Sequence, residues 1–488
     1  MPVLSDANAL LEIAAPLELR GSVTEVRGLA LCVADLPAPV GATVRVTPKR
    51  NESALGVEAE VIGFDHQHTL VMPLGSTAGI HPGDRVTLLD HAARARVGQC
   101  LLGRVLNATG QPIDDEGPLG ETVVRPLHPQ PVEPLDRPVI DQPLATGIRA
   151  IDALTPLGRG QRMGVFAAAG VGKSTLLGAM ARRTAADVSV IALVGERGRE
   201  VREFIERTLG PEGLARSVVV CATGDEPALL RIRAAALATA VAEYFRDEGC
   251  DVLLLMDSVT RLCQAQRQVG LSAGEPPTTK GYPPSMFSML PALLERSGRT
   301  RHGSITGLYS ILVESDDMDE PVADACRGIL DGHILLSRTL AEQGHFPAID
   351  VTSSISRVAE EVTTRQQARR RAEVLKLVSA YHRVEDLLNI GAYAAGSNPE
   401  FDLAIACKPA IDQLLQQGRN EGPARSALPA HRAGEETARR RAATPAAAGP
   451  AVSVPLAMGR EPPATGRWPP AASHWPEKHA SQTLTPDP

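Results

Sequence analysis

Short apolar stretches separated by turn residues dominate the first part of the chain. Residues 21–26, 42–46 and 57–61 alternate apolar and polar positions or are rich in β-branched residues, and Gly, Pro, Asn and Asp lie between them. This pattern predicts short β-strands, and regularly spaced short strands are typical of a small β-barrel. We therefore predict an N-terminal barrel domain over residues 1–95.

The pattern changes between residues 96 and 360. After a connecting segment with a proline-rich, extended stretch at residues 126–143, fully apolar runs alternate with segments of helical spacing. Residues 188–194 are apolar except for Ser189, and residues 252–256 are apolar throughout, as expected for strands that are buried on both faces. Strands that alternate with helices predict a mostly parallel sheet covered by helices, so this domain belongs to the α/β class.

The third part of the chain, residues 361–420, has a helical pattern throughout. Apolar residues recur there at helical spacing, at Ala368, Ala372, Leu375, Val378 and Tyr381. From residue 421 the composition changes, because the stretch 423–488 holds 12 of the 39 prolines. We predict a helical domain over residues 361–420 and a disordered tail over residues 421–488.

The stretch from Gly164 to Thr175 joins an apolar run to a helical pattern through a loop of small residues. This order, with Lys173 and Ser174 at the start of the helix, is typical of a loop that binds nucleotide phosphates through backbone N–H groups and the helix N-terminus. The strict pattern has its first glycine where this chain has Ala167, and a glycine-rich turn with an incidental lysine is the alternative. The predicted nucleotide-binding residues are Ala168, Ala169, Gly170, Val171, Gly172, Lys173, Ser174 and Thr175.

Four polar side chains have expected roles around this loop. Lys173 would contact the β- and γ-phosphates, and the Ser174 hydroxyl would ligate Mg²⁺. Asp257 directly follows one apolar run, and Glu196 follows another after Gly195. Because ligands bind beyond the carboxyl ends of strands in open α/β sheets, we expect Asp257 near Mg²⁺ and Glu196 beside the water that attacks the γ-phosphate. The alternatives are a helix cap for Asp257 and a salt-bridged loop acid for Glu196.

Charge and composition limit the partners. The net charge is −7, and the barrel region lacks interleaved basic and aromatic residues, which argues against nucleic acid as a main partner and favours oligomerisation. The seven cysteines form no C-x-x-C pair, as expected for reduced thiols in the cytosol. No apolar window is long enough to span a membrane, and residues 1–20 lack the pattern of a signal peptide.

Several segments together resemble a known family. From residue 20 to residue 418 the chain resembles the flagellum-specific and type III secretion export ATPases, which are related to the catalytic subunit of rotary ATP synthases. The segments that carry the resemblance are the phosphate loop and residues 73–75, 101–106, 195–200, 274–285, 331–338, 346–350 and 354–358.

The resemblance implies a RecA-like ATP-binding domain and roles for particular residues. Lys173 and Ser174 match the phosphate and Mg²⁺ positions, and Asp257 matches the Mg²⁺-site aspartate. Glu196 matches the catalytic glutamate, and Arg197 matches the arginine beside it. Arg357 matches an arginine finger that acts in the neighbouring subunit's site, so that hydrolysis depends on assembly. An interface salt bridge is the alternative for Arg357.

The resemblance also implies an assembly. We expect a homohexamer that uses ATP and Mg²⁺, lies in the cytoplasm, and is peripheral at the inner face of the cytoplasmic membrane. The implied partners are a stator-like regulator, a central-stalk protein, export substrates with their chaperones, and a membrane export gate. Residues 274–285 match a loop on the pore side, and the acidic stretch 314–320 matches a loop that faces the ring axis and holds no metal.

Four other functions compete with flagellar export. A virulence-type secretion ATPase is the nearest, because residues 389–393, 396–399 and 279–282 resemble the flagellar branch whereas residues 167–169 occur more readily in the secretion branch. A rotary ATP synthase subunit would need a non-catalytic partner subunit. A hexameric RNA translocase would need a basic, aromatic barrel. A non-catalytic nucleotide-binding module would not need the full set of Glu196, Asp257 and Arg357.

Overall fold

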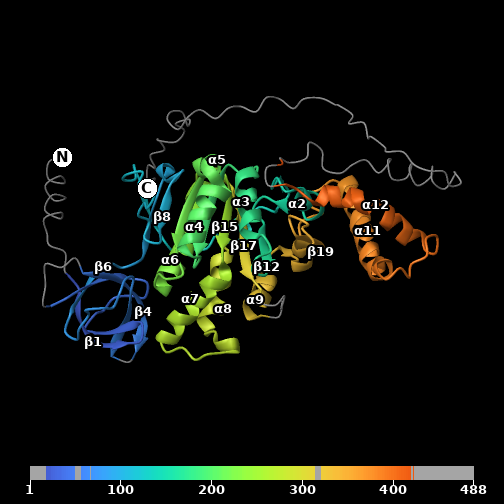
Figure 1. Cartoon of the computed structure of the whole chain (residues 1–488). Coiled ribbons are helices and arrows are strands. Elements are labelled where there is room, and N and C mark those ends of the chain that lie inside the picture. The colour runs from blue at the N-terminus through green and yellow to red at the C-terminus, as the bar shows by residue number, and fades with distance from the viewer. Residues whose placement is uncertain (1–17, 50–55, 66, 314–319, 419–420, 422–488) are drawn as a thin grey trace, which may run out of the picture. The chain divides into compact units, whose positions relative to one another are not determined.

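The computed structural model describes residues 18–49, 56–65, 67–313, 320–418 and 421 (Figure 1). The disordered tail predicted for residues 421–488 therefore lies outside the described residues, except for Glu421. Residues 314–319 of the acidic stretch also lie outside them.

The first strands close into a barrel in the order β1-β2-β5-β4-β3-β6. These strands are β1 (Arg20–Arg27), β2 (Ala30–Ala34), β3 (Thr43–Thr47), β4 (Val57–Asp65), β5 (His68–Pro73) and β6 (Arg85–Asp90). Alternation decides which side chains fill the barrel, because successive residues of a strand point to opposite faces. In β3, Val44 and Val46 are buried while Arg45 between them is partly exposed. The predicted barrel is confirmed.

Short elements connect the barrel to the main sheet. The strands β7 (Arg94–Val97) and β9 (Val123–Pro126) pair with each other, as do β10 (Pro143–Leu144) and β11 (Leu157–Gly158). Between them, β8 (Val105–Asn107) leaves this segment and joins the edge of the main sheet beside β14.

A nine-stranded sheet forms the centre of the fold, in the order β19-β18-β12-β17-β15-β13-β14-β8, with β16 beside β17. Its further strands are β12 (Arg162–Ala167), β13 (Val188–Val194), β14 (Ser217–Ala222), β15 (Asp251–Asp257), β16 (Gly298–Arg299), β17 (Ser304–Leu312), β18 (Gly332–Leu336) and β19 (Ile349–Ser356). Pairing is parallel from β18 to β8, whereas β19 and β16 are antiparallel to their neighbours. The mostly parallel α/β sheet predicted from the sequence is confirmed. We call the edge where β12, β13, β15, β17 and β18 end the carboxyl edge, and the opposite one the amino edge.

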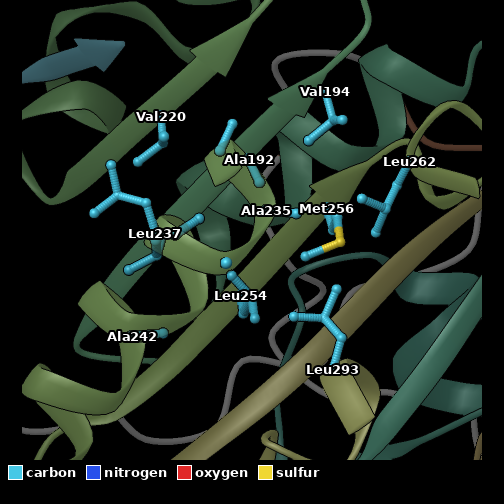
Figure 2. Close-up of a cluster of buried hydrophobic side chains, with 14 of the residues drawn as sticks. Ala192, Val194, Val220, Ala235, Leu237, Ala242, Leu254, Met256, Leu262 and Leu293 are labelled. Atoms are coloured by element: carbon cyan, nitrogen blue, oxygen red, sulfur yellow. The ribbon is translucent and has the colours of Figure 1, made fainter. Parts of the chain in front are cut away.

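The side chains on each face of the sheet belong to a separate hydrophobic cluster. Figure 2 shows the first cluster, which contains Ala192 and Val194 of β13, Leu254 of β15 and Leu237 of helix α6 (Ala228–Asp247). Helices α7 (Val259–Ser272), α8 (Pro284–Leu294) and α9 (Pro321–Ile329) contribute to the same cluster.

The alternate residues of the strands, including Ile191 of β13, face the second cluster. This cluster includes side chains of α2 (Arg149–Leu154) and α3 (Lys173–Arg183). The remaining short helical elements are η1 (Gln99–Leu101), η2 (Pro134–Asp136), α4 (Gly198–Glu203), η3 (Phe204–Leu209), α5 (Gly210–Ala215), η4 (Thr279–Gly281) and α10 (Arg338–Glu342).

Two long helices follow the sheet, α11 (Arg365–Asn389) and α12 (Pro399–Leu415). A capping box between Thr364 and Gln367 begins α11. Of the predicted apolar stripe, Val378 is buried, but Ala372 is exposed, because the buried face of α11 runs instead through Ala380 and Val384. The predicted C-terminal helical region is confirmed. Across the described parts of the chain, no helix has both the length and the hydrophobicity needed to cross a membrane.

Candidate nucleotide-binding site

The phosphate loop lies between the end of β12 at Ala167 and the start of α3 at Lys173, at the carboxyl edge of the sheet. Gly170 and Gly172 have φ angles of 86° and 91°, in the left-handed region that glycine adopts without strain. Gly172 is the N-cap of α3, and within the described residues no side chain caps this helix. The first amides of α3 are therefore available to an anion.

Ala167 does not distort the loop. It is the last residue of β12, where it pairs in register with Leu312 and Leu336, and it is 1% exposed. Its backbone does not have a positive φ angle. A strand position accommodates alanine as well as glycine, so the departure from the strict motif has no consequence for the turn itself.

Lys173 and Asp257 meet at the base of the loop. Lys173 Nζ lies 2.5 Å from Asp257 Oδ1, and the two side chains are only 10% and 4% exposed. Ser310 Oγ, on β17, donates to the same carboxylate oxygen at 2.9 Å. Asp257 is the last residue of β15 and the chain then enters α7, so the strand end aims this carboxylate at the phosphate loop. The sequence did not identify Ser310, because its role follows from β17 lying beside β15.

Glu196 lies in the same group, just beyond the end of β13. Burial and the negative charge of Asp257 raise the pKa of Glu196 to about 7, while the positive charges of Lys173 and Arg261 oppose this rise. Arg261 Nε donates to Glu196 Oε1 at 3.3 Å. The Glu196 carboxyl group therefore takes up and releases a proton near neutral pH.

Arg261 is a second residue that sequence reasoning missed. It lies in the first turn of α7 and packs against Gly195, whose φ angle is 75°. A Cβ at Gly195 would lie 2.7 Å from Arg261 Cδ, so glycine at this position leaves room for the guanidinium to reach Glu196. The sequence does indicate that Arg261 lies near the site, because it follows Asp257 by four residues in a helix that begins at the carboxyl edge.

The remaining predicted residues near the loop are less buried. Ser174 and Ala169 are exposed, and Thr175 is half-buried in the first turn of α3. Arg197 is 77% exposed and its guanidinium lies 3.6 Å from the Glu200 carboxylate, so it is not part of the buried group around Asp257.

Arg357 lies at the opposite edge of the sheet from the phosphate loop. It follows Ser356, which pairs with Gly332 at the start of β18, whereas Ala167 pairs with Leu336 at the end of β18. Four residues of a strand span about 13 Å, so Arg357 cannot reach the phosphate loop of its own subunit without a rearrangement of the sheet. The structure thus separates Arg357 from the other predicted site residues.

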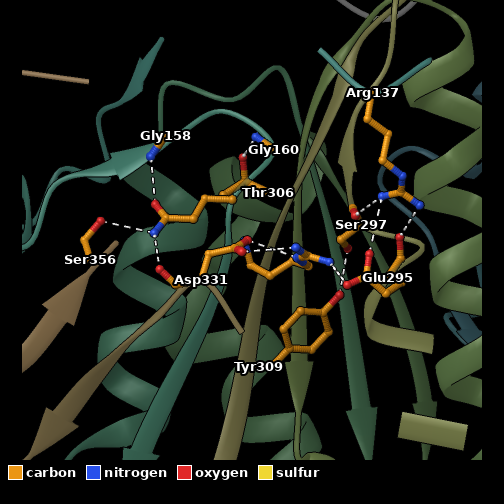
Figure 3. Close-up of polar contacts among 11 residues, drawn as sticks. Arg137, Gly158, Gly160, Glu295, Ser297, Thr306, Tyr309, Asp331 and Ser356 are labelled. Carbon is orange, nitrogen blue, oxygen red and sulfur yellow. Dashed lines mark hydrogen bonds and ion pairs between the residues drawn. The ribbon is translucent and has the colours of Figure 1, made fainter. Parts of the chain in front are cut away.

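Hydrogen bonds at the amino edge hold the backbone of Arg357 through its neighbours, and Figure 3 shows the polar contacts around two of these, Asp331 and Ser356. Arg357 N donates to Asp331 O at 2.9 Å. The Asp331 carboxylate accepts two hydrogen bonds of 3.0 Å from the Arg162 guanidinium, and Gln161 Nε2 donates at 3.1 Å both to Asp331 O and to Ser356 Oγ. The Arg357 side chain itself is exposed, and its guanidinium donates a 3.3 Å hydrogen bond to Arg327 O. A fixed backbone with an exposed guanidinium suits a residue that acts on another subunit.

A cavity of about 660 Å³ adjoins the loop, with Gly172, Thr175, Arg183, Phe346 and Gln417 among its lining residues. The Phe346 side chain is 47% exposed, and its ring lies 3.7 Å from the place where a Cβ of Gly172 would be. An exposed aromatic ring beside a phosphate loop can stack on a nucleotide base. The sequence alone did not single out Phe346, although aromatic residues make up only 3% of this chain.

The residues present suit a nucleotide and Mg²⁺. The loop supplies uncapped amides and Lys173 for phosphates, and Ser174 and Asp257 offer the oxygen ligands that Mg²⁺ prefers. Within the described residues there is no group of three or more His, Cys, Asp or Glu that could enclose a metal ion. Mg²⁺ usually keeps several waters and is held by few side chains together with substrate phosphates.

Comparisons with known proteins agree with this site. The family model "ATP synthase alpha/beta family, nucleotide-binding domain" matches residues 147–356, and the model "T3SS EscN ATPase C-terminal domain" matches residues 363–427. The flagellum-specific ATP synthase of Bacillus subtilis (strain 168) is 50% identical over 406 residues, which are 82% of this chain and 91% of the relative. The type 3 secretion system ATPase of Xanthomonas euvesicatoria is 47% identical over 397 residues, 81% of this chain and 89% of the relative.

A solved structure is similar over most of the chain. It is that of the assembled ATPase EscN in complex with its central stalk EscO, from the type III secretion system of enteropathogenic E. coli. The TM-score is 0.76 at 42% sequence identity, and the match covers 86% of this chain and 99% of the other.

Proposed function

Because the chain belongs to the family of flagellum-specific and type III secretion ATPases, we propose that it hydrolyses ATP to energise protein export. In this proposal the active unit is a homohexameric ring with ATP bound between adjacent subunits. The observation that carries the proposal is the arrangement of Lys173, Asp257 and Glu196 at the phosphate loop, with Arg357 at the far edge of the same sheet.

Binding of the triphosphate uses the loop and Lys173. Backbone amides from Ala168 to Thr175 surround the β-phosphate, and the Lys173 ammonium turns from Asp257 to the β- and γ-phosphates. Ser174 and Asp257 would hold Mg²⁺, which would neutralise phosphate charge. The buried Lys173–Asp257 pair keeps both side chains in position before the nucleotide enters. Phe346 covers the base at the other end of the cavity.

Glu196 acts on the attacking water. Its carboxylate accepts a hydrogen bond from the water and orients it toward the γ-phosphate, while Arg261 fixes the direction of the carboxylate. A pKa of about 7 places Glu196 where it can accept a proton under physiological conditions. Arg197 follows Glu196 directly in the chain. Because its side chain is exposed, we propose that it contacts an adjacent subunit at this site.

Arg357 completes the site of the next subunit. A guanidinium brought to the γ-phosphate stabilises the charge that develops in the transition state. Since Arg357 lies at the amino edge and the loop at the carboxyl edge, the chain supplies the finger to a neighbour and receives one in return. Hydrolysis therefore depends on ring assembly.

The partners and location follow from family membership. We propose a cytoplasmic ring that lies against the inner face of the cytoplasmic membrane, with a stator-like regulator, a central-stalk protein, export substrates and chaperones, and a membrane export gate as partners. The relative EscN is described as assembled with its central stalk EscO, which supports the stalk. Nucleic acid is not a partner in this proposal, in agreement with the net charge of −7.

The flagellar system remains our first proposal and a virulence-type system the second. Relatives of both kinds match at 50% and 47% identity, so identity alone does not separate them. The match to a C-terminal domain of secretion ATPases at residues 363–427 favours both over a rotary synthase subunit. Deletion of this chain in its source organism should abolish swimming if the system is flagellar. It should abolish protein secretion into host cells if the system is of the virulence type.

The direct test is ATP turnover per subunit against protein concentration, using the purified chain alone and measuring its mass by light scattering. We expect turnover to rise steeply where the hexamer forms, with the Lys173→Ala variant as the inactive control. A low rate at every concentration would mean that another subunit completes the site, which favours the rotary synthase. Stimulation by RNA would favour a translocase.

A further inference from the structure

Gln417 joins the end of the C-terminal helices to the wall of the nucleotide cavity. It lies two residues beyond α12 and is only 8% exposed. Its backbone N–H donates to Phe346 O at 2.9 Å, and its side-chain Oε1 accepts from Arg149 N at 2.9 Å. Its Nε2 donates to Gly147 O at 3.0 Å and to Glu421 O at 3.1 Å.

The partners of Gln417 come from segments that are far apart in the sequence but border one cavity. Arg149 and Phe346 line this cavity together with Gln417 itself. The Phe346 ring lies over Gly172, the residue that precedes α3. Gln417 therefore connects the base side of the cavity to the segment that follows α12. Its backbone N–H holds Phe346 O, and its buried side chain anchors that backbone to Arg149 and Gly147.

The helices behind Gln417 are packed onto the same face of the sheet. Ile411 and Leu415 of α12 are buried in the cluster that contains Val171 of the phosphate loop and Leu176 of α3. A movement of α12 away from the sheet would expose these apolar side chains and would pull on the hydrogen bonds of Gln417. The position of α12 and the position of Phe346 are therefore linked through Gln417.

We propose that Gln417 is a positioning residue that sets Phe346 against the nucleotide base and so makes ATP affinity depend on the placement of the C-terminal helices. This inference rests on the proposed function, because it assumes that ATP occupies this cavity. Gln417 does not reach the phosphate side of the site, which is built from the loop, Lys173 and Asp257. Loss of its hydrogen bonds should weaken contacts to the base and leave contacts to the triphosphate intact.

The test compares ATP with inorganic tripolyphosphate, which has the phosphates but no base. Gln417→Met keeps the length of the side chain and the backbone N–H to Phe346 O, but it loses the side-chain hydrogen bonds that anchor this backbone to Arg149 and Gly147. We expect the KM for ATP to rise about tenfold in this variant, since base–aromatic stacking contributes at about that level. We expect kcat to stay within about twofold and the Kd for tripolyphosphate to be unchanged. Gln366→Met is the matched control, because Gln366 is an exposed glutamine of α11 that is not among the residues lining the cavity.

A double-mutant cycle separates positioning from general damage to the fold. In a Phe346→Ala background, Gln417→Met should have no further effect on the KM for ATP, because the ring that Gln417 positions is gone. If Gln417→Met does not fold, Gln417→Glu serves instead: it keeps the acceptor for Arg149 N but loses the donor to Gly147 O, and we expect a smaller rise in KM.

Two results would overturn the inference while leaving the proposed function in place. One is an unchanged KM for ATP in both Gln417 variants. The other is an equal loss of ATP and tripolyphosphate binding, which would assign Gln417 a purely structural role. If the wild-type chain bound neither ligand, the proposed function would fail and the inference with it.

Discussion

Lys173 Nζ and Asp257 Oδ1 lie 2.5 Å apart, although 84 residues separate them in the chain. Both side chains are almost completely buried, and a buried charge is tolerated only when it is paired. The pair meets because β12 and β15 flank β17 in one parallel sheet, so that their carboxyl ends are close together. The negative charge of Asp257 also raises the pKa of Glu196, which links the groups expected to bind phosphate and to activate water.

The first prediction concerns Lys173→Ala. Without the ammonium, the phosphates lose their closest cation and the Asp257 carboxylate keeps only its hydrogen bond with Ser310. We expect turnover to fall by at least about a hundredfold and the melting temperature to drop, because breaking a buried ion pair leaves one charge unpaired. Turnover and thermal unfolding measure the two effects.

A suitable control for this change is Lys376→Ala on α11, where the ammonium is 72% exposed and 3.8 Å from Glu400. Surface pairs of this kind contribute little to stability, so this variant should behave like wild type. Near-normal ATP hydrolysis by Lys173→Ala would remove the assignment of the phosphate loop.

Replacing Glu196 by Gln should separate binding from hydrolysis. The amide is close in size to the carboxyl group but cannot take a proton from water, so we expect kcat to fall by about 10²- to 10⁴-fold with little change in the Kd for ATP. The Kd can be measured with a fluorescent ATP analogue and kcat by phosphate release. Normal turnover with weakened binding would contradict the role assigned to Glu196.

Thermal unfolding of the same variant provides a second readout. The pKa of Glu196 is raised from 4.5 to about 7, so the native state holds this proton more tightly than the unfolded chain does. The resulting contribution to stability is present below pH 4.5 and is lost as the pH rises through about 7. At pH about 8 Glu196→Gln should therefore melt no lower than wild type, which would show that the loss of turnover is not caused by unfolding.

The pH dependence of the wild-type enzyme follows from the same shift. Since kcat/KM reports ionisation of the free enzyme, we expect it to rise with pH through about 7, as the Glu196 carboxyl loses its proton. The residual activity of Glu196→Gln, measured in the same buffers, corrects for the titration of ATP itself and should lack this rise. Identical profiles for the two proteins would show that another group controls the pH dependence.

Arg357→Ala should affect hydrolysis only in the assembled ring. We expect normal nucleotide binding by the single subunit and turnover that no longer rises with protein concentration. The sharpest test is to mix Arg357→Ala with Glu196→Gln, since each variant carries the residue that the other lacks. Random mixing in equal amounts restores both residues at about a quarter of the interfaces, so we expect about a quarter of wild-type turnover if the finger acts between subunits.

Each variant alone should stay inactive in that experiment. Mixing Glu196→Gln with Lys173→Ala controls for nonspecific stabilisation of the ring, because both changes damage the phosphate-loop side of the site and no interface regains a complete site. An inactive mixture of Arg357→Ala and Glu196→Gln, in rings of confirmed size, would place the finger elsewhere. Arg327→Ala is a further control, because it removes a neighbouring guanidinium while the Arg327 carbonyl that accepts from Arg357 remains.

Local patterns in the sequence were enough to predict the barrel, the buried parallel strands and the phosphate loop. Val44 and Val46 alternate with polar residues because only one face of their strand is buried. In the strand before Lys173, the residues that follow Arg162 carry no polar side chain because both faces are covered. Asp257 could be placed near the loop from sequence, since the carboxyl ends of parallel strands share one edge. These inferences depend on neighbouring residues and on general rules of packing, which the linear sequence contains.

Other relationships depended on which strands are neighbours and on the direction in which each one runs. Ser310 reaches Asp257 because β17 lies next to β15, and Arg261 reaches Glu196 because glycine at position 195 leaves room for its side chain. Arg357 lies away from the loop because β19 runs antiparallel to β18, and no periodicity along the chain encodes that direction. Likewise, Gln417 meets Phe346 only through folding, since a contact across 71 residues follows from the packing of α12 and not from any local pattern.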